Sequence, residues 1–329
     1  MSDAAAEALS AGRAPAESQI RAVFFGSGGF ALPILDALIG IPGVVVEAVV
    51  SAPDRPVGRK AVLTPTPVTA RARELDLPVL QPLRVRRPEA VEQLRALAPD
   101  LIVLADYGQL IPRVLLELPP RGFLNLHPSA LPRWRGAAPI PATILAGDSE
   151  SAVTMIVVTE EMDAGPIVAT EPLKVLADDT AVTLEERAAQ VAGELLRRAL
   201  PEWLSGRLVA RPQAAEGVTM TRPLRREDGR LDPSRSAAEL ERQIRAYQPW
   251  PGSHVETPAG RLIVWSAHVT PGEPGDEARW IVAGGRDGLA LATPSGRLTL
   301  DEVQLAGKKR GSAEELRRGH PALVGASAG

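Results

Sequence analysis

The chain has 329 residues, of which 45% are hydrophobic and 23% charged, and its formal net charge is −3. This length favours two domains, because one hydrophobic core rarely grows beyond ~250–300 residues. The absence of cysteine excludes disulfides, thiolate nucleophiles and Cys-ligated metal sites, and no apolar run approaches the ~20 residues that span a bilayer. Any catalysis must therefore use oxygen or nitrogen groups, and the chain holds only one asparagine and four histidines.

Residues 1–19 are rich in Ala, Ser, Gly and Pro and contain no apolar run. A secretory signal needs an apolar core of ~7–15 residues, and an organellar transit peptide avoids the acidic residues that this segment carries. We therefore expect a disordered tail on a cytoplasmic protein.

From residue 20 onward, short β-branched runs alternate with helical periods, which is typical of an α/β domain built on a doubly wound parallel sheet. The runs expected to be buried strands are 21–25, 44–50, 101–105, 123–126 and 153–158. The expected helices are 31–39, 67–75, 88–96, 140–146 and 180–204. Several of them have Pro near the first turn, where its missing N–H costs little. We place this domain at residues 20–206.

Residues 207–221 are expected to form a linker to a second, all-β domain at 222–320, followed by a short tail at 321–329. Its short runs at 261–265, 280–282, 289–292 and 298–303 are each bounded by Gly, Pro or Asp, which predicts a small barrel. Residues 206–329 hold 18 Lys and Arg against 15 Asp and Glu. Contacts with a polyanion are therefore expected there and at local arginine clusters.

A glycine-rich turn follows the first strand and satisfies G-x-G-x-x-A with Gly26, Gly28 and Ala31, a form of the dinucleotide fingerprint. A nucleotide-dependent dehydrogenase is therefore one hypothesis. That class also needs an acid at the end of the second strand to bind ribose hydroxyls. Here Glu47 is in mid-strand and Asp54 follows a proline, which favours an ordinary strand-to-helix turn.

Asn125 and His127 stand at i and i+2 at the end of a predicted strand, so both side chains point to one face. The carboxyl ends of parallel strands are where α/β sheets build their sites. Adjacent amide and imidazole N–H groups can donate to an oxygen that becomes negative during transfer of a carbonyl group. His127 can also accept a proton from an attacking amine.

Asp163 is the best candidate to orient His127, because it follows a strand at a glycine-containing turn with no adjacent cation. Taken alone, an Asp-x-Gly is usually only a turn, and its joint occurrence with Asn125 and His127 is what indicates a site. Zinc is disfavoured because the other histidines are scattered, without H-x-x-x-H spacing. A Ser129 nucleophile is disfavoured because no G-x-S-x-G surrounds it.

The segments NLHPSALPRWRGAAPI at 125–140 and MDAGPI at 162–167 resemble the folate-dependent formyltransferases, and the match runs from about residue 21 to 320. Three further segments are similar to the branch that formylates initiator methionyl-tRNA. They are PDRPVGRK at 53–60, YQPWPG at 247–252 and VQLAGKK at 303–309. The resemblance implies a Rossmann-like formyltransferase domain, a C-terminal barrel resembling the oligonucleotide-binding fold, and 10-formyltetrahydrofolate as donor.

By the same resemblance, Asn125, His127 and Asp163 are the catalytic residues of a metal-free transfer to the methionine amine, and the protein is expected to be a monomer. Ala130 stands where the family's S-L-L-P signature has Leu. Folate contacts are expected from Tyr107, Gly108, Ser129, Ala130, Leu131 and Pro132. Contacts with tRNA are expected from Arg55, Arg59, Lys60, Arg133, Trp134, Arg135, Arg222, Lys308 and Lys309.

The nearest alternative is a formyltransferase that acts on an amino sugar nucleotide. Those relatives typically have Gly where Pro128 stands and lack the P-D-R-P-x-G-R loop, so residues 53–59 favour tRNA. A dehydrogenase rests on the Gly26 turn alone, and a non-catalytic tRNA-binding protein has no need of Asn125.

Overall fold

The computed structural model describes residues 19–58, 60–278, 280–285 and 288–328. Arg59 and all but the last residue of the expected N-terminal tail lie outside the described residues. No helix of the described chain is long and apolar enough to cross a membrane.

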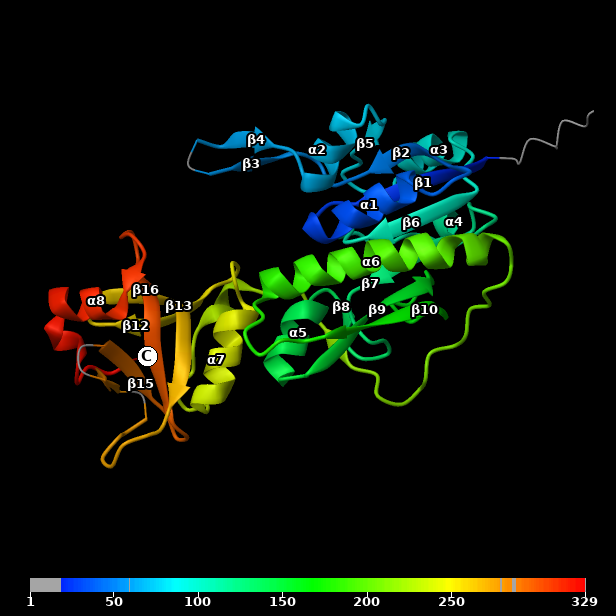
Figure 1. Ribbon diagram of the computed structural model, residues 1–329. Helices are drawn as coiled ribbons and strands as arrows, with labels where there is room; N and C mark the ends of the chain where they lie inside the picture. Colours follow the sequence, from blue (N-terminus) through cyan, green and yellow to red (C-terminus); the bar gives the residue numbers. More distant parts are fainter. Residues whose placement is uncertain (1–18, 59, 279, 286–287, 329) are drawn as a thin grey trace, which may run out of the picture.

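The first domain is built on a seven-stranded sheet with strand order β10-β9-β7-β6-β1-β2-β5 (Figure 1). Its strands are β1 (Ile20–Gly26), β2 (Val44–Val50), β5 (Val79–Leu80), β6 (Leu101–Ala105), β7 (Phe123–His127), β9 (Glu150–Val157) and β10 (Ile167–Lys174). The five strands from β7 to β5 in this order are parallel. β9 is antiparallel to β7, and β10 is antiparallel to β9. The five expected strands are present, but the one at 153–158 runs against its neighbours, and β10 was not predicted.

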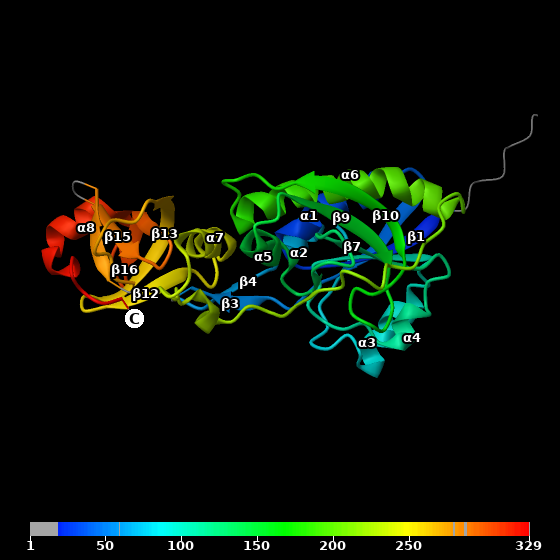
Figure 2. The ribbon, with the colours of Figure 1, turned by 90° about the horizontal axis from the view of Figure 1, so that it is seen from below.

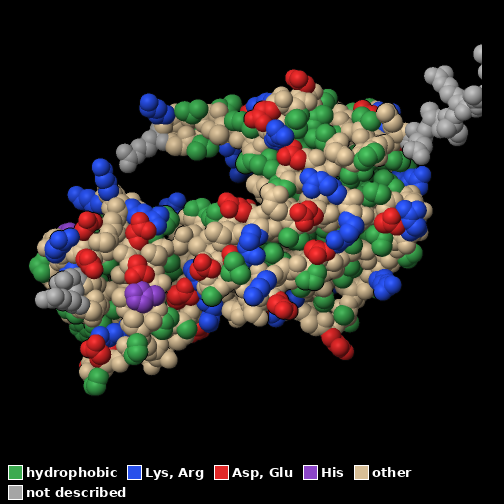
Figure 3. Space-filling model, in the orientation of Figure 1, with side chains coloured by type: hydrophobic (Ala, Val, Ile, Leu, Met, Phe, Trp, Pro, Cys, Tyr) green, Lys and Arg blue, Asp and Glu red, His purple; other side chains and the backbone are tan. Residues whose placement is uncertain are grey.

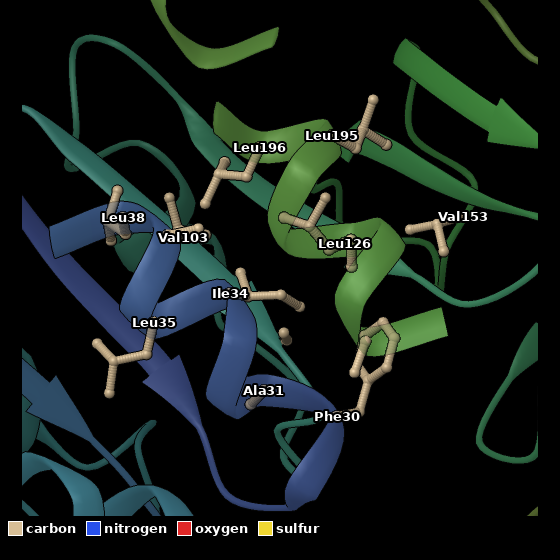
Figure 4. Packing of buried hydrophobic residues seen from close by; sticks show 14 of the residues in the cluster. Phe30, Ala31, Ile34, Leu35, Leu38, Val103, Leu126, Val153, Leu195 and Leu196 are labelled. Atoms are coloured by element: carbon tan, nitrogen blue, oxygen red, sulfur yellow. The ribbon is translucent and has the colours of Figure 1, made fainter. Parts of the chain in front are cut away.

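Helices cover both faces of this sheet (Figure 2). One face packs against α1 (Leu32–Ile39), α2 (Pro67–Glu74), α5 (Pro139–Ala146) and α6 (Ala181–Leu204). The other packs against α3 (Pro88–Ala96) and the short α4 (Arg113–Leu116). Leu38, Val103, Leu126 and Leu196 meet in the first of these layers (Figure 4). Burial of each such side chain contributes roughly 1.5–3 kcal/mol.

A two-stranded hairpin, β3 (Arg55–Val57) and β4 (Val62–Thr64), leaves the first domain and extends toward the second (Figure 1). Its apolar residues do not join a core, because Val57, Val62 and Leu63 are 57%, 59% and 64% exposed. The space-filling view shows a hollow between this hairpin and the second domain (Figure 3). The hairpin therefore forms an arm over an open surface.

The second domain is a curled antiparallel sheet of β12 (Ser253–Thr257), β13 (Gly260–Thr270), β14 (Ile281–Gly284), β15 (Gly288–Ala292), β16 (Arg297–Leu305) and β17 (Gly311–Ser312). It also holds two helices that were not predicted, α7 (Ala237–Ala246) and α8 (Ala313–Gly319). α7 begins with a capping box between Ser236 and Glu239, a local signal that sequence reasoning passed over. The expected tail at 321–329 begins with a short 3-10 helix, Pro321–Leu323, and packs into this domain through Leu323 and Ala328.

The two domains are joined by α7 and by the segment expected to be a free linker. Arg242 and Arg245 of α7 donate hydrogen bonds to the carbonyls of Leu145 (3.1 Å) and Asp179 (2.8 Å). Residues 207–221 are also attached to the first domain. The backbones of Ile167 and Arg211 exchange hydrogen bonds of 2.7 and 2.8 Å. Further along, β11 (Met220–Thr221) pairs with β8 (Arg135–Gly136).

Candidate active site

β7 presents its two polar side chains on a single face of the sheet. Leu124 and Leu126 pack into the layer of α1 and α6, whereas Phe123 packs into the layer of α3 and α4. Because side chains alternate along a strand, Asn125 and His127 share the side of Phe123. They are 7% and 5% exposed. Both are therefore largely shielded from solvent.

Asp163 comes from the connection between β9 and β10 and joins the two side chains of β7. The Asn125 amide donates to Asp163 Oδ1 at 3.3 Å. His127 Nδ1 lies 3.7 Å from Asp163 Oδ2, and the Gly136 N–H donates to that same oxygen at 2.8 Å. The structure therefore assembles the predicted Asn, His and Asp, although Asp163 is 38 residues from Asn125 in the chain.

The other nitrogen of His127 is bound to the backbone. His127 Nε2 lies 3.0 Å from the Trp134 carbonyl oxygen. Since a carbonyl oxygen only accepts hydrogen bonds, Nε2 carries a proton in this arrangement. Nδ1 is therefore the nitrogen on the side of Asp163. The 3.7 Å separation is longer than a hydrogen bond, as catalytic contacts often are in the absence of substrate.

Gln213 of the interdomain segment holds the loop that carries Asp163. Its amide Nε2 donates to the carbonyls of Asp163 (2.7 Å) and Gly165 (2.8 Å). Arg135 donates to Gln213 Oε1 at 3.1 Å and 2.8 Å. The Gln213 oxygen therefore faces Arg135, and its NH₂ group faces the loop. Asp163 has a φ of +50°, a backbone region that costs about 1–3 kcal/mol for a non-glycine residue and needs such support.

Two glycines allow the chain to pass close to the site. A Cβ on Gly165 would lie 1.7 Å from the Val157 carbonyl oxygen, and a Cβ on Gly136 would lie 2.2 Å from that of Thr221. Gly136 also has a φ of +104°, which favours glycine. These close approaches place the Gly136 N–H on Asp163.

Of the residues expected to contact folate, some are hydrogen-bonded within the protein and others are exposed to solvent. The Ser129 hydroxyl donates to the Arg133 carbonyl at 2.7 Å, and Ser129 is fully buried, so it supports the turn. Ala130 and Gly108 are exposed, and nothing lies within 4 Å of a Cβ built on Gly108. The Tyr107 hydroxyl is buried and has no hydrogen-bond partner among the described residues. Burial also raises the pKa of Tyr107 to about 12.

In the glycine-rich turn, neighbouring side chains occupy the space that a bound phosphate would need. A Cβ on Gly26 would lie 2.7 Å from the Phe24 ring and 2.9 Å from Ala31, so tight packing accounts for this glycine. A Cβ on Gly28 would lie 1.8 Å from an Asp106 carboxylate oxygen. The Asp106 carboxylate accepts the Gly28 N–H. The residue keeps exposed surface, but loss of water around the carboxylate raises the pKa of Asp106. A dinucleotide pyrophosphate would meet negative charge here.

The residues expected to contact tRNA fall into two groups. The Arg133 guanidinium pairs with Asp148 at 2.8 Å and stacks 4.3 Å from the Trp134 ring centroid. The Trp134 indole also donates to Asp148 at 3.0 Å. Arg135 is 8% exposed and bonded to Gln213, which gives it a structural role; its contact with tRNA stays a prediction.

The remaining basic residues lie on the surface. Arg55 and Lys60 are exposed on the β3–β4 hairpin, and Lys308 and Lys309 are exposed after β16. None of these four has an ion-pair partner within the part of the chain that the structure describes. Arg222 is exposed but pairs with both carboxylate oxygens of Asp228. Figure 3 shows Lys and Arg side chains beside the hollow between the hairpin and the second domain.

Sequence reasoning missed Gln213 and Thr221, which both come from the expected linker. The Thr221 hydroxyl donates to the Arg135 carbonyl and accepts the Ala138 N–H, each at 3.0 Å. No local pattern marks either residue, because their partners lie 48 to 86 positions earlier in the chain.

Comparison with known proteins places this geometry in context. The family model described as formyl transferase matches residues 20–200, and the model described as formyl transferase, C-terminal domain, matches residues 223–321. A protein of Halorhodospira halophila named methionyl-tRNA formyltransferase is 41% identical over 93% of this chain and 98% of its own. A protein of the same name from Thermus thermophilus is 42% identical over 94% of this chain and 99% of its own.

Solved structures show the same fold at low sequence identity. The N-formyltransferase of Helicobacter canadensis, in complex with folinic acid and dTDP-3-aminofucose, superposes with a TM-score of 0.62 at 15% identity and covers 86% of this chain and 98% of its own. HypX of Aquifex aeolicus gives a TM-score of 0.59 at 18% identity over 91% of this chain and 49% of its own.

Proposed function

The chain belongs to the formyl transferase family, and on this premise we propose that it transfers the formyl group of 10-formyltetrahydrofolate to the methionine amino group of initiator methionyl-tRNA. The observation that carries the proposal is the contact of a single carboxylate, Asp163, with both Asn125 and His127. The similarity to proteins named for this reaction extends over nearly the whole chain.

Asn125 is proposed to stabilise the carbonyl oxygen of the formyl group as it gains negative charge. His127 is proposed to assist once its Nδ1 has accepted a proton, because its Nε2–H is already bound to the Trp134 carbonyl. The Asn125 amide has two N–H groups, one of which is directed to Asp163, so the other remains for the substrate oxygen. Donors fixed in advance in a site with little water stabilise such charge strongly, and loss of one typically costs about 2.7–4 kcal/mol of barrier.

Asp163 and His127 are proposed to move the proton that the attacking amine must lose. The amine reacts only as a neutral nucleophile, and its nitrogen releases a proton once the new C–N bond forms. His127 Nδ1 and Asp163 Oδ2 lie on one side of the imidazole, 3.7 Å apart. The proton can therefore pass through these groups to the departing folate nitrogen. When bound, the folate supplies the activated formyl carbon, and the two substrates gain rate from being held together.

The donor is proposed to lie beside Tyr107, Gly108, Ala130 and Leu131. This region fits a ligand because the Tyr107 hydroxyl is buried without a partner among the described residues. Such a group costs about 1–3 kcal/mol unless something accepts or donates to it. Gly108, next in the chain, is exposed and has nothing within 4 Å of a built Cβ, and Ala130 is also exposed.

The tRNA is proposed to lie in the hollow between the β3–β4 hairpin and the second domain. Arg55 and Lys60 are exposed on the hairpin, and Lys308 and Lys309 are exposed on the second domain. Unpaired cations on both sides suit a phosphate backbone.

An assay of formyl transfer tests the proposal. Wild-type protein is incubated with labelled 10-formyltetrahydrofolate and either initiator methionyl-tRNA or an amino sugar nucleotide, and labelled product is measured. We expect transfer to tRNA, and its loss in Asn125→Ala, His127→Ala and Asp163→Asn. Transfer to the sugar nucleotide alone would reassign the substrate, and full activity in all three variants would refute the site.

A further inference from the structure

The segment 247–252 has no part in the proposed chemistry, yet it holds a large aromatic side chain in solvent. The turn is closed by a hydrogen bond of 2.8 Å from the Gly252 N–H to the Tyr247 carbonyl. Trp250, between Pro249 and Pro251, is 52% exposed. A Trp ring offers about 150–250 Å² for burial, so a fold that leaves half of it outside forgoes considerable stabilisation.

Trp250 borders a groove of about 280 Å³ that a second indole, that of Trp265, also lines. Trp265 is fixed in place. Its Nε1 donates to Gln304 at 3.0 Å, and its carbonyl accepts the Gln248 amide at 2.6 Å. The Arg310 guanidinium stacks 4.8 Å from the Trp265 ring centroid. The groove thus combines aromatic surfaces with an adjacent cation, Arg310, which also forms an exposed ion pair with Glu302.

The charged and polar residues that line the groove favour an anion. They are Arg226, Arg261 and His254, and no Asp or Glu of the described residues lines it. Arg226 is exposed and has no ion pair among the described residues. Arg261 pairs with Glu256 at 2.7 Å, but both side chains are nearly half exposed, so this pair contributes little and a phosphate can replace it.

His254 supplies the groove with a neutral hydrogen-bonding ring. It is 9% exposed. Burial, followed by the nearby Arg261 charge, lowers the pKa of His254, with Glu256 opposing and Arg230 adding to the effect. A neutral imidazole can both donate and accept, which matches the mixed donors and acceptors on the edge of a nucleobase.

We propose that this groove binds one unpaired nucleotide of the tRNA substrate, with its base against Trp250 and Trp265 and its phosphate at Arg226 and Arg261. The proposal rests on the proposed function. Stacking on aromatic rings beside cations is how proteins hold single-stranded nucleic acid. A proline-rich peptide could also fill an aromatic groove, but it would leave Arg226 without a partner among the described residues. Continuity with Arg310, Lys308 and Lys309 also favours RNA.

The test compares Trp250→Ala with Trp280→Ala in the full chain. Trp280 is 39% exposed in the same domain and does not line the groove, so it serves as the matched control. Affinity for labelled initiator tRNA is measured by gel shift, with thermal melting to verify folding. We expect Trp250→Ala to bind tRNA about fivefold to 100-fold more weakly and Trp280→Ala to bind as wild type does. Trp250→Phe, which keeps a ring, should recover most of the affinity.

A second arm reports the phosphate contact. Arg226→Ala should weaken binding and reduce the salt dependence of log K by about one unit. Equal affinity of Trp250→Ala and Trp280→Ala for tRNA would overturn the proposal, as would a labelled proline-rich peptide that requires Trp250 while tRNA binding does not. Because binding is read without catalysis, failure of wild-type protein to formylate tRNA would refute the proposed function and leave the groove assignment standing.

Discussion

Gln213→Glu provides a sharp test of how the site is held together. The substitution keeps an oxygen for the Arg135 guanidinium, which now bonds to Gln213 Oε1 at 2.8 Å. It replaces the amide N–H groups that donate to the Asp163 and Gly165 carbonyls at 2.7 and 2.8 Å with an oxygen that can only accept. The contact with Arg135 is therefore retained, while the two bonds to the loop are lost.

The magnitude follows from those two bonds. Each neutral hydrogen bond contributes roughly 1 kcal/mol net, so loss of both removes about 2 kcal/mol, or roughly 30-fold in the population of the held loop. Asp163 is in the αL region, with φ at +50°, and relaxes when released. We expect kcat to fall about 10-fold to 100-fold, since small misplacements of a catalytic group cost this much, while KM for folate changes little.

Steady-state formylation of methionyl-tRNA and thermal melting check this prediction. Glu216→Gln is the control, because Glu216 is an exposed residue of the same segment. Gln213→Ala should lose both activity and stability, since Arg135, only 8% exposed, would be left with Glu161 at 3.6 Å. Wild-type kcat in Gln213→Glu would refute the idea that Gln213 positions Asp163.

The remaining predictions concern single groups. Asn125→Ala should lower kcat about 10²- to 10³-fold in a transfer assay, as expected for loss of one oxyanion donor, and a smaller loss would argue against that role. Arg55→Ala should raise KM for tRNA and leave KM for folate unchanged. It should also reduce the slope of log K for tRNA binding against log salt concentration by about one unit. Asp106→Asn should be more stable than wild type at neutral pH. Loss of water around the carboxylate raises the pKa of Asp106, so the contribution of the protonated group to folding stability is present at low pH and is lost as the pH rises through that raised pKa. The gain should disappear below the ordinary value of 3.8, and a gain in melting temperature that is independent of pH would contradict this.

Those parts of the site that depend on local geometry could be predicted from the sequence. Asn125 and His127 share a face because two-residue spacing along a strand requires it. The direction of β9 could not be predicted, because hydrophobic runs do not encode strand direction. The edge strand β10 was missed because it mixes Glu171, Pro172 and Lys174 with apolar residues, and this departs from a buried run.

Two arginines near the site have bonding partners that the sequence does not reveal. The arginines at 133 and 135 were expected to contact tRNA, and arginine side chains mostly face solvent. Their partners Asp148 and Gln213 lie 15 and 78 residues further along the chain, so only tertiary structure reveals that both are bonded within the protein. Gln213 itself belongs to a segment whose composition indicates a loop, and its role depends on contacts that no local pattern records.

The attachment of Gln213 to the Asp163 loop has a consequence for how this protein divides into modules. A boundary drawn from composition at residue 206 keeps Asn125, His127 and Asp163 on one fragment, and it removes the amide that holds the last of them in place. The connection between the domains therefore also holds the loop that carries Asp163. A swap of the second domain that replaced this connection would remove the support of Asp163, and we therefore expect it to lower catalytic activity.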